Sequence, residues 1–60
     1  MGAYETMYLT ISEISQILKV SKQTVRNLIK SGELRAIRVA HVFRVRKDIF
    51  DEYIKENEYL

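Results

Sequence analysis

The sequence predicts a single small α+β domain, mostly α, in which two short helices precede a two-stranded β-hairpin and a last helix follows it. The spacing of apolar residues supports this prediction, because it is helical up to Gly32, alternating in residues 37–46 and helical again after Lys47. A chain of 60 residues has room for one hydrophobic core close to the smallest stable size. We expect a flexible arm at residues 1–8, the domain at residues 9–57 and a tail at residues 58–60.

The first helix is expected at residues 11–18 because a capping signal precedes it. Thr10 and Glu13 fit a capping box, in which each side chain accepts a hydrogen bond from the backbone amide of the other residue. Leu9 and Ile14 occupy the positions of a hydrophobic staple across the same helix start. The residues that this helix should turn toward the core are Ile14, Ile17 and Leu18.

A second helix should follow a tight turn at Lys19 and Val20. Ser21 can cap the start of this helix, and Gly32 can adopt the left-handed conformation that closes its end. One narrow stripe between them is apolar and consists of Val25, Leu28 and Ile29. Two short helices joined by such a turn, the second of them basic, form a helix-turn-helix.

The remaining faces of the second helix are polar. A rotation of about 100° per residue places Gln23 and Asn27 almost opposite the apolar stripe. Carboxamides suit adenine, because they can pair with its N6 and N7 together, and an arginine suits guanine. The candidate base-reading residues are therefore Gln23, Thr24, Arg26 and Asn27.

Apolar and basic side chains alternate in residues 37–46, which predicts two strands and a hairpin. A two-residue turn at Ala40 and His41 would mix the two faces, so we expect a turn centred on His41 instead. The pairs in that register are Val39 with Phe43, Ile37 with Val45, and Arg38 with Arg44. Facing arginines repel each other unless an anion lies across them, and a phosphate would relieve the repulsion. The alternative is that the two side chains splay into water.

Helical spacing returns in residues 47–57, where the apolar side chains are Ile49, Phe50, Tyr53 and Ile54. Asp48 falls in the first turn, where the helix dipole favours a carboxylate. Asp51 and Lys55 have the spacing of an ion pair on one helix face. We expect this helix to close the core.

Charge is divided sharply along the chain, although the net charge is only +2. Residues 19–47 hold nine Lys or Arg against one acid, a balance of +8, and the other residues hold one lysine against seven acids, a balance of −6. Such a division is typical of proteins in which one face meets a nucleic acid. A solvated surface of mixed charge is the alternative interpretation.

Composition disfavours several other classes of protein. The chain has no cysteine and one histidine, His41, so we expect no metal and no cofactor. We expect no enzymatic activity, because His41 falls in a predicted turn without a nucleophile or carboxylate beside it. No apolar run approaches the roughly 20 residues that span a bilayer, and the first residues lack the pattern of a signal peptide. A soluble cytoplasmic protein with no membrane partner and no small-molecule substrate is the resulting expectation.

The order of elements and the residues at their junctions resemble one known family. The residues that carry this resemblance are Leu9, Thr10, Glu13, Leu18, Val20, Ser21, Thr24, Val25, Leu28, Ile29, Ser31, Gly32, Glu33, Leu34, Arg38, Val39, Phe43, Arg44, Val45, Phe50, Tyr53 and Ile54. As a set they resemble the excisionase-type branch of the MerR-like winged helix-turn-helix family, over about residues 8–54. The chain departs from the family pattern at Lys19, where glycine is usual, at Arg35, where proline is usual, and at the tip of the hairpin.

The resemblance implies that the second helix enters the major groove of double-stranded DNA while the hairpin acts as a wing on the backbone or minor groove. Small members of this branch resemble excisionases, which bind repeated sites, bend DNA and direct an integrase toward excision. The candidate phosphate-contacting and wing residues are Ser21, Lys22, Lys30, Arg38, His41, Arg44 and Arg46. One small module has little contact area, so we expect a protein that is monomeric when free and binds DNA cooperatively with neighbouring copies of itself.

Two other functions fit parts of the same sequence. A small transcriptional repressor of a phage or mobile element would use the same surface, and the brevity of the chain favours the excisionase over it. A protein-interaction module could dock the basic helix on an acidic partner. That module would not require two carboxamides and an arginine on one helix face, and it would not predict DNA binding that weakens steeply with salt.

Overall fold

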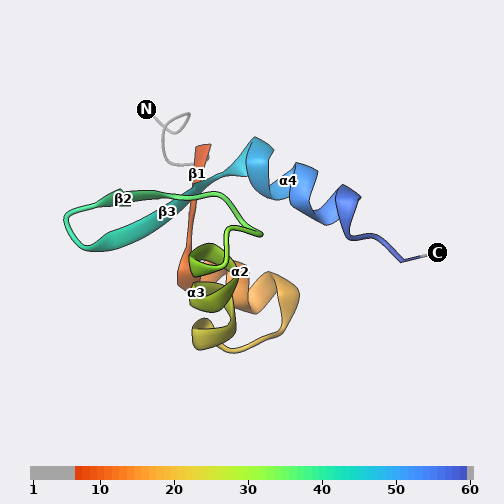
Figure 1. Cartoon of the computed structure of the whole chain (residues 1–60), viewed down its shortest axis with the longest axis horizontal. Helices are drawn as coiled ribbons and strands as arrows, with labels where there is room; N and C mark the ends of the chain where they lie inside the picture. Colours follow the sequence, from red (N-terminus) through yellow and green to blue (C-terminus); the bar gives the residue numbers. More distant parts are fainter. Residues whose placement is uncertain (1–6, 60) are drawn as a thin grey trace.

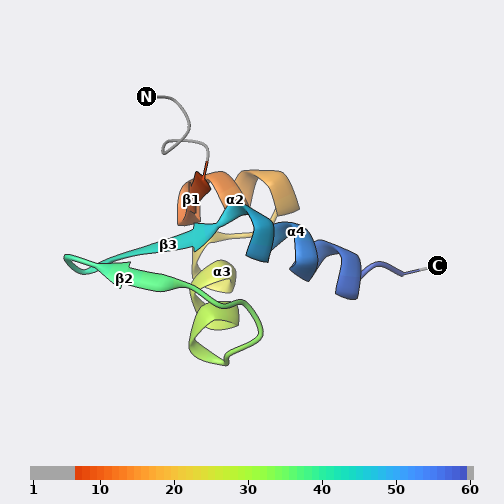
Figure 2. The ribbon, with the colours of Figure 1, turned by 90° about the horizontal axis from the view of Figure 1, so that it is seen from above.

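The computed structural model describes residues 7–59 of the chain. Its elements are β1 (Tyr8–Thr10), α2 (Ile11–Leu18), α3 (Lys22–Lys30), β2 (Ile37–Val39), β3 (Val42–Arg46) and α4 (Lys47–Glu56). The three strands form an antiparallel sheet in the order β1-β3-β2. The hairpin and α4 extend toward opposite ends of the molecule, and α2 and α3 lie beside the sheet between them (Figure 1, Figure 2). The predicted fold class, a small winged helix-turn-helix, is confirmed.

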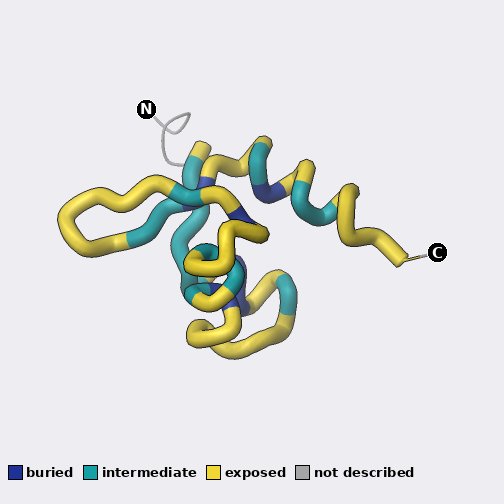
Figure 3. Tube along the Cα trace, viewed as in Figure 1, coloured by how far each residue is buried: buried dark blue, intermediate teal, exposed yellow. Residues whose placement is uncertain are grey.

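The hydrophobic core lies where α2, α3, β3 and α4 meet (Figure 3). Its buried apolar residues are Ile14, Val25, Leu34, Val45 and Phe50. Each of them comes from a different helix, strand or loop, so the core fixes the helix-turn-helix against β3 and α4.

The inward face of α2 is rotated from the predicted one. Ile17 is 56% exposed, so its assignment to the core is wrong. Ser15 is buried instead, and its hydroxyl donates to the Ser12 carbonyl at 2.7 Å. The buried side of the helix follows Ile11, Ile14 and Leu18, which are spaced by three and four residues, and the rotation of about 100° per residue turns Ile17 away from that side.

The expected caps form at the starts of α2 and α3. The Glu13 amide donates to the Thr10 hydroxyl at 3.0 Å and the Thr10 amide donates to the Glu13 carboxylate at 2.8 Å, which completes the capping box. At α3, the Thr24 amide donates to the Ser21 hydroxyl at 3.1 Å. These bonds satisfy amides that the first turn of a helix leaves without a backbone acceptor.

A left-handed residue follows each helix of the helix-turn-helix. Lys19 closes α2 with φ 57° and ψ 45°, and the next amide, of Val20, donates to the Ser15 carbonyl at 3.0 Å. Gly32 has φ 85° and donates to the Ile29 carbonyl at 3.1 Å, as the sequence predicts. Lys19 therefore adopts a conformation that costs a residue with a Cβ atom more than it costs glycine.

The strand β1 is absent from the sequence prediction. Tyr8, expected at the end of a flexible arm, pairs with Arg46, and β1 continues along β3 to the pairing of Thr10 with Arg44. Three residues are too few to show alternation in the sequence, and the helix begins directly after them. The rest of the expected arm, residues 1–6, lies outside the described residues.

The predicted register of the hairpin is wrong. The strands are joined by a two-residue turn at Ala40 and His41, whose φ angles are 49° and 70°. The observed pairs are Ile37 with Arg44, Arg38 with Phe43, and Val39 with Val42. Two consecutive positive φ angles match the twist of paired strands, so this short turn is favoured even without glycine.

The facing pair of arginines that the other register predicts does not form. Arg38 lies opposite Phe43 instead, with its guanidinium carbon 5.8 Å from the centre of the ring. The prediction assumed that all apolar side chains of the hairpin would share the buried face. Ile37 and Val39 in fact lie on the open side, 44% and 56% exposed.

The last helix agrees with the prediction except in its ion pair. Phe50 is buried and Asp48 occupies the first turn of α4. Asp51 pairs with Lys47 at 3.2 Å, so the expected pair with Lys55 is wrong. Lys47 lies four residues before Asp51 and Lys55 lies four residues after it, so both lysines have the spacing of an ion pair with Asp51. In the tail, Tyr59 is 97% exposed, and the final residue lies outside the described part.

Candidate nucleic-acid interface

The outward face of α3 carries two carboxamides side by side. Gln23 and Asn27 are both exposed, and the Gln23 Nε2 atom donates to the Asn27 Oδ1 atom at 3.1 Å. On the opposite face, Val25 is completely buried and holds the helix on the core. The helix is therefore seated by its apolar stripe and presents polar groups outward, as the sequence predicts.

A positively charged hollow separates α3 from the hairpin. It has a volume of about 350 Å³, and its lining includes the start of α2 and the start of β3. The cationic or titratable side chains around it are Lys22, Arg26, His41 and Arg44. Within the described part of the chain, no acidic side chain lines it. A concave surface lined by charges of one sign attracts counter-ions, so the hollow suits an anionic group such as a phosphate.

The short β1 explains why the hollow opens here. β1 pairs with β3 only as far as Arg44, so the remaining residues of β3, Val42 and Phe43, lie beside the helices and not beside another strand on that edge. The two-residue turn then places His41 directly at the rim. Side chains 15 to 22 positions apart in the chain are thereby gathered from α3 and the wing around one space.

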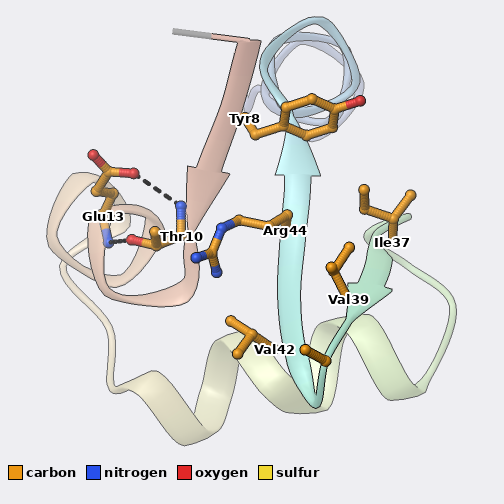
Figure 4. Close-up of a pocket in the computed structure, with 8 residues that line it drawn as sticks. Tyr8, Thr10, Glu13, Ile37, Val39, Val42 and Arg44 are labelled. Carbon is orange, nitrogen blue, oxygen red and sulfur yellow. Dashed lines mark hydrogen bonds between the residues drawn. The ribbon is translucent and has the colours of Figure 1, made fainter. Parts of the chain in front are cut away.

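Arg44 also borders a second hollow, on the open face of the sheet (Figure 4). This hollow has a volume of about 700 Å³ and is lined largely by Tyr8, Ile37, Val39 and Val42. Figure 4 shows the Arg44 side chain reaching from β3 toward β1. Its Nη1 atom donates to the Phe43 carbonyl at 3.0 Å, which holds the guanidinium near the sheet edge.

The other predicted site residues lie outside the charged hollow. Arg46 forms an ion pair with Asp48 at 3.0 Å, and Arg38 lies over the Phe43 ring. Lys30 is exposed at the end of α3.

Ser21 and Thr24 are joined to each other at the start of α3. Their hydroxyl oxygens are 2.9 Å apart. Thr24 also lines a separate, mainly apolar hollow of about 450 Å³ with Leu28 and Tyr53. The structure thus places Thr24 toward α4 and gathers Lys22, Arg26, His41 and Arg44 on the side of the hairpin.

One exposed arginine was not among the predicted site residues. Arg35 is exposed in the loop before β2 and, with Arg46, lines a hollow of about 210 Å³. It belongs to the basic stretch of residues 19–47, but a loop residue has no periodicity that would assign it to a face.

Several absences apply to the described residues. In residues 7–59, acidic partners within ion-pair distance occur only for Arg46 and Lys47. The cations of the charged hollow therefore have no acidic partner among the described residues. The same residues contain no cluster of three or more His, Cys, Asp or Glu side chains that could hold a metal ion. None of the helices in that part is long and apolar enough to cross a bilayer.

Comparison with known proteins agrees with this geometry. The model of the helix-turn-helix domain family matches residues 8–58. The chain belongs to this family. A helix-turn-helix domain is a DNA-binding unit in which the second helix lies in the major groove. The matched segment includes all the helices and strands described above.

Individual relatives are similar over most of this chain. Rv0500A of Mycobacterium tuberculosis (strain H37Rv), which carries the provisional name of a DNA-binding protein, is 46% identical over 41 residues, covering 68% of this chain and 53% of that protein. YvgK of Bacillus subtilis (strain 168) is 47% identical over 49 residues, covering 82% of this chain and 16% of YvgK. The chain thus spans about half the length of its mycobacterial relatives. No solved structure matches it.

Proposed function

We propose that this protein binds double-stranded DNA sequence-specifically, with α3 in the major groove and the hairpin along the backbone. The charged hollow between α3 and the hairpin is the observation that carries the proposal, because it lies beside a helix face that presents carboxamides. Phosphate contacts fix the position of a protein on DNA and base-edge contacts select the sequence. Membership of the helix-turn-helix family supports the same class of ligand.

The proposed roles follow from position and side-chain chemistry. Gln23, Arg26 and Asn27 face the base edges, with Thr24 at the margin of this group. The residues assigned to phosphates are Ser21, Lys22, Lys30, Arg38, His41, Arg44 and Arg46. Among these, Arg46 makes the weakest contribution, because its guanidinium already has a carboxylate partner in Asp48.

Within this class, the resemblance to excisionases favours an architectural protein of a mobile element. It would bind adjacent repeats cooperatively, bend the DNA and direct an integrase toward excision. Repression of a promoter that overlaps those repeats is compatible with the same binding. Cooperativity follows from size, because a single module of this kind buries only about 600 to 1,000 Å² of protein surface on DNA.

A gel-shift titration tests the proposal. The purified protein is first used to select duplexes from a random pool, and its binding to a selected duplex and to a scrambled one is then compared as salt is raised. Preference for the selected duplex, with affinity falling steeply with salt, is the expected result. Equal and weak binding to both duplexes would refute sequence-specific recognition and favour a protein partner. Excision measured with and without the protein, beside the integrase of its own genome, separates an excisionase from a repressor.

A further inference from the structure

The hydrogen bond between the two carboxamides of α3 has a consequence for base recognition. Gln23 and Asn27 are four residues apart on the exposed face, and the Nε2 atom of Gln23 donates to the Oδ1 atom of Asn27 at 3.1 Å. Side chains with this spacing on a helix lie one above the other. Two carboxamides joined in this way do not act as two separate readers.

The direction of the hydrogen bond determines which donors and acceptors each residue has left for a base. A carboxamide oxygen has two lone pairs and its nitrogen has two hydrogens. Asn27 receives one bond at its oxygen, so it retains one lone pair and both N–H groups. These suffice for adenine, whose N6 amino group donates and whose N7 accepts in the major groove. Gln23 has used one N–H group on its neighbour and keeps the other N–H group and both lone pairs, so the bond does not remove its recognition groups but couples its amide to that of Asn27.

A free asparagine amide can turn by 180° and exchange its oxygen and nitrogen with little change in shape. In the turned orientation it would present its nitrogen to the adenine amino group and its oxygen to N7, and both contacts would fail. The hydrogen bond couples the two amides: with the Gln23 nitrogen toward Asn27, as in the structure, the Asn27 oxygen faces Gln23. An amide that is oriented before binding avoids part of the ordering cost on DNA.

We propose that Gln23 is a positioning residue that orients the Asn27 carboxamide, and that Asn27 alone reads an adenine. This inference rests on the proposed DNA-binding function. It differs from the interpretation of the sequence, in which both carboxamides read bases, because it assigns the two residues to one base pair.

The test uses duplexes selected from a random pool by the wild-type protein, each then substituted one base pair at a time. Asn27→Ala should lose preference at one base pair by about 5- to 150-fold in relative affinity, and Gln23→Met should lose preference at the same base pair by a smaller factor, because the adenine can still select the correct orientation of a free Asn27 amide. The double variant should lose no more preference there than Asn27→Ala alone, because Gln23 acts only through Asn27. The salt dependence should stay that of the wild type, since no charge is removed.

Two charged variants separate positioning from direct contact. Gln23→Lys keeps a donor toward the Asn27 oxygen and has no acceptor, so it should retain the adenine preference while binding all duplexes more tightly. Gln23→Glu can only accept, so it should turn the Asn27 amide around and abolish the preference. Relative affinities between duplexes are compared, which removes the uniform effect of the added charge.

The outcomes distinguish this inference from the proposed function. Loss of preference at a different base pair in Gln23→Met, or additive losses in the double variant, would overturn the positioning role and leave DNA binding intact. Failure of Gln23→Lys to retain the preference would also overturn it. If the wild-type protein selects no common sequence from the pool, the proposed function fails first.

Discussion

Replacement of Lys22 by alanine should reduce the slope of log DNA affinity against log salt concentration by about one unit. Lys22 is exposed at the start of α3 and lines the charged hollow with Arg26, His41 and Arg44. Each phosphate contact contributes about 0.9 to the slope of log affinity against log salt. When salt is raised from about 50 mM to about 200 mM, the DNA affinity of the wild type should therefore fall about 3.5-fold more than that of the variant.

Lys55→Ala provides the matched control. Lys55 is also an exposed helical lysine, but it lies in the last turn of α4, among the acidic residues at the far end of the molecule from the hairpin (Figure 1). Both variants lose the same charge, so a nonspecific effect of net charge would be equal in the two. The assay is a gel-shift titration of a selected duplex at several salt concentrations. An unchanged slope in Lys22→Ala, or an equal reduction in Lys55→Ala, would refute the assignment of the charged hollow to phosphate.

Three further predictions concern stability, each measured by thermal or urea unfolding. Lys19→Gly should stabilise the protein by up to about 1 kcal/mol, because glycine removes the cost of φ 57°, whereas Lys19→Ala keeps the Cβ atom and should give no such gain. Val25→Ala should destabilise the protein by about 2 kcal/mol, since it deletes two fully buried methyl groups and leaves a cavity. A shift in the unfolding midpoint smaller than a few degrees would show that contacts other than those of Val25 hold α3 on the core. Thr10→Ala should cost about 1 kcal/mol through loss of the capping box, and Thr10→Ser, which keeps the hydroxyl, should recover most of it.

The helices could be predicted from the sequence because their signals are local. A capping box, a serine cap and a glycine stop each act within four residues; α2 begins, and α3 begins and ends, where those signals place them. The outward position of Gln23 and Asn27 follows from the same local geometry once Val25 is assigned to the core.

The sheet was harder to predict because its register depends on contacts distant in the sequence. The alternation of Ile37 and Val39 indicates a strand, but it does not say that their face stays open to solvent. β1 is recognisable only through its pairing with β3, which lies more than 30 residues further along the chain. The charged hollow depends on the register of the hairpin and on the pairing of β1 with β3. The sequence alone therefore identified the cations of the hollow but not their grouping.

The fold gives the two parts of the proposed interface different degrees of constraint. A helix of nine residues is not stable alone in water, so α3 keeps its shape through Ser21, Val25 and the closure at Gly32. The hairpin extends beyond the core, and all of β2 and the turn are exposed (Figure 3). Base reading requires fixed donors and acceptors, whereas a phosphate contact tolerates small displacements of a charge. The residues proposed to read bases therefore lie on the element seated on the core, and the wing, which contacts only the backbone in this scheme, can adjust to the local shape of the DNA.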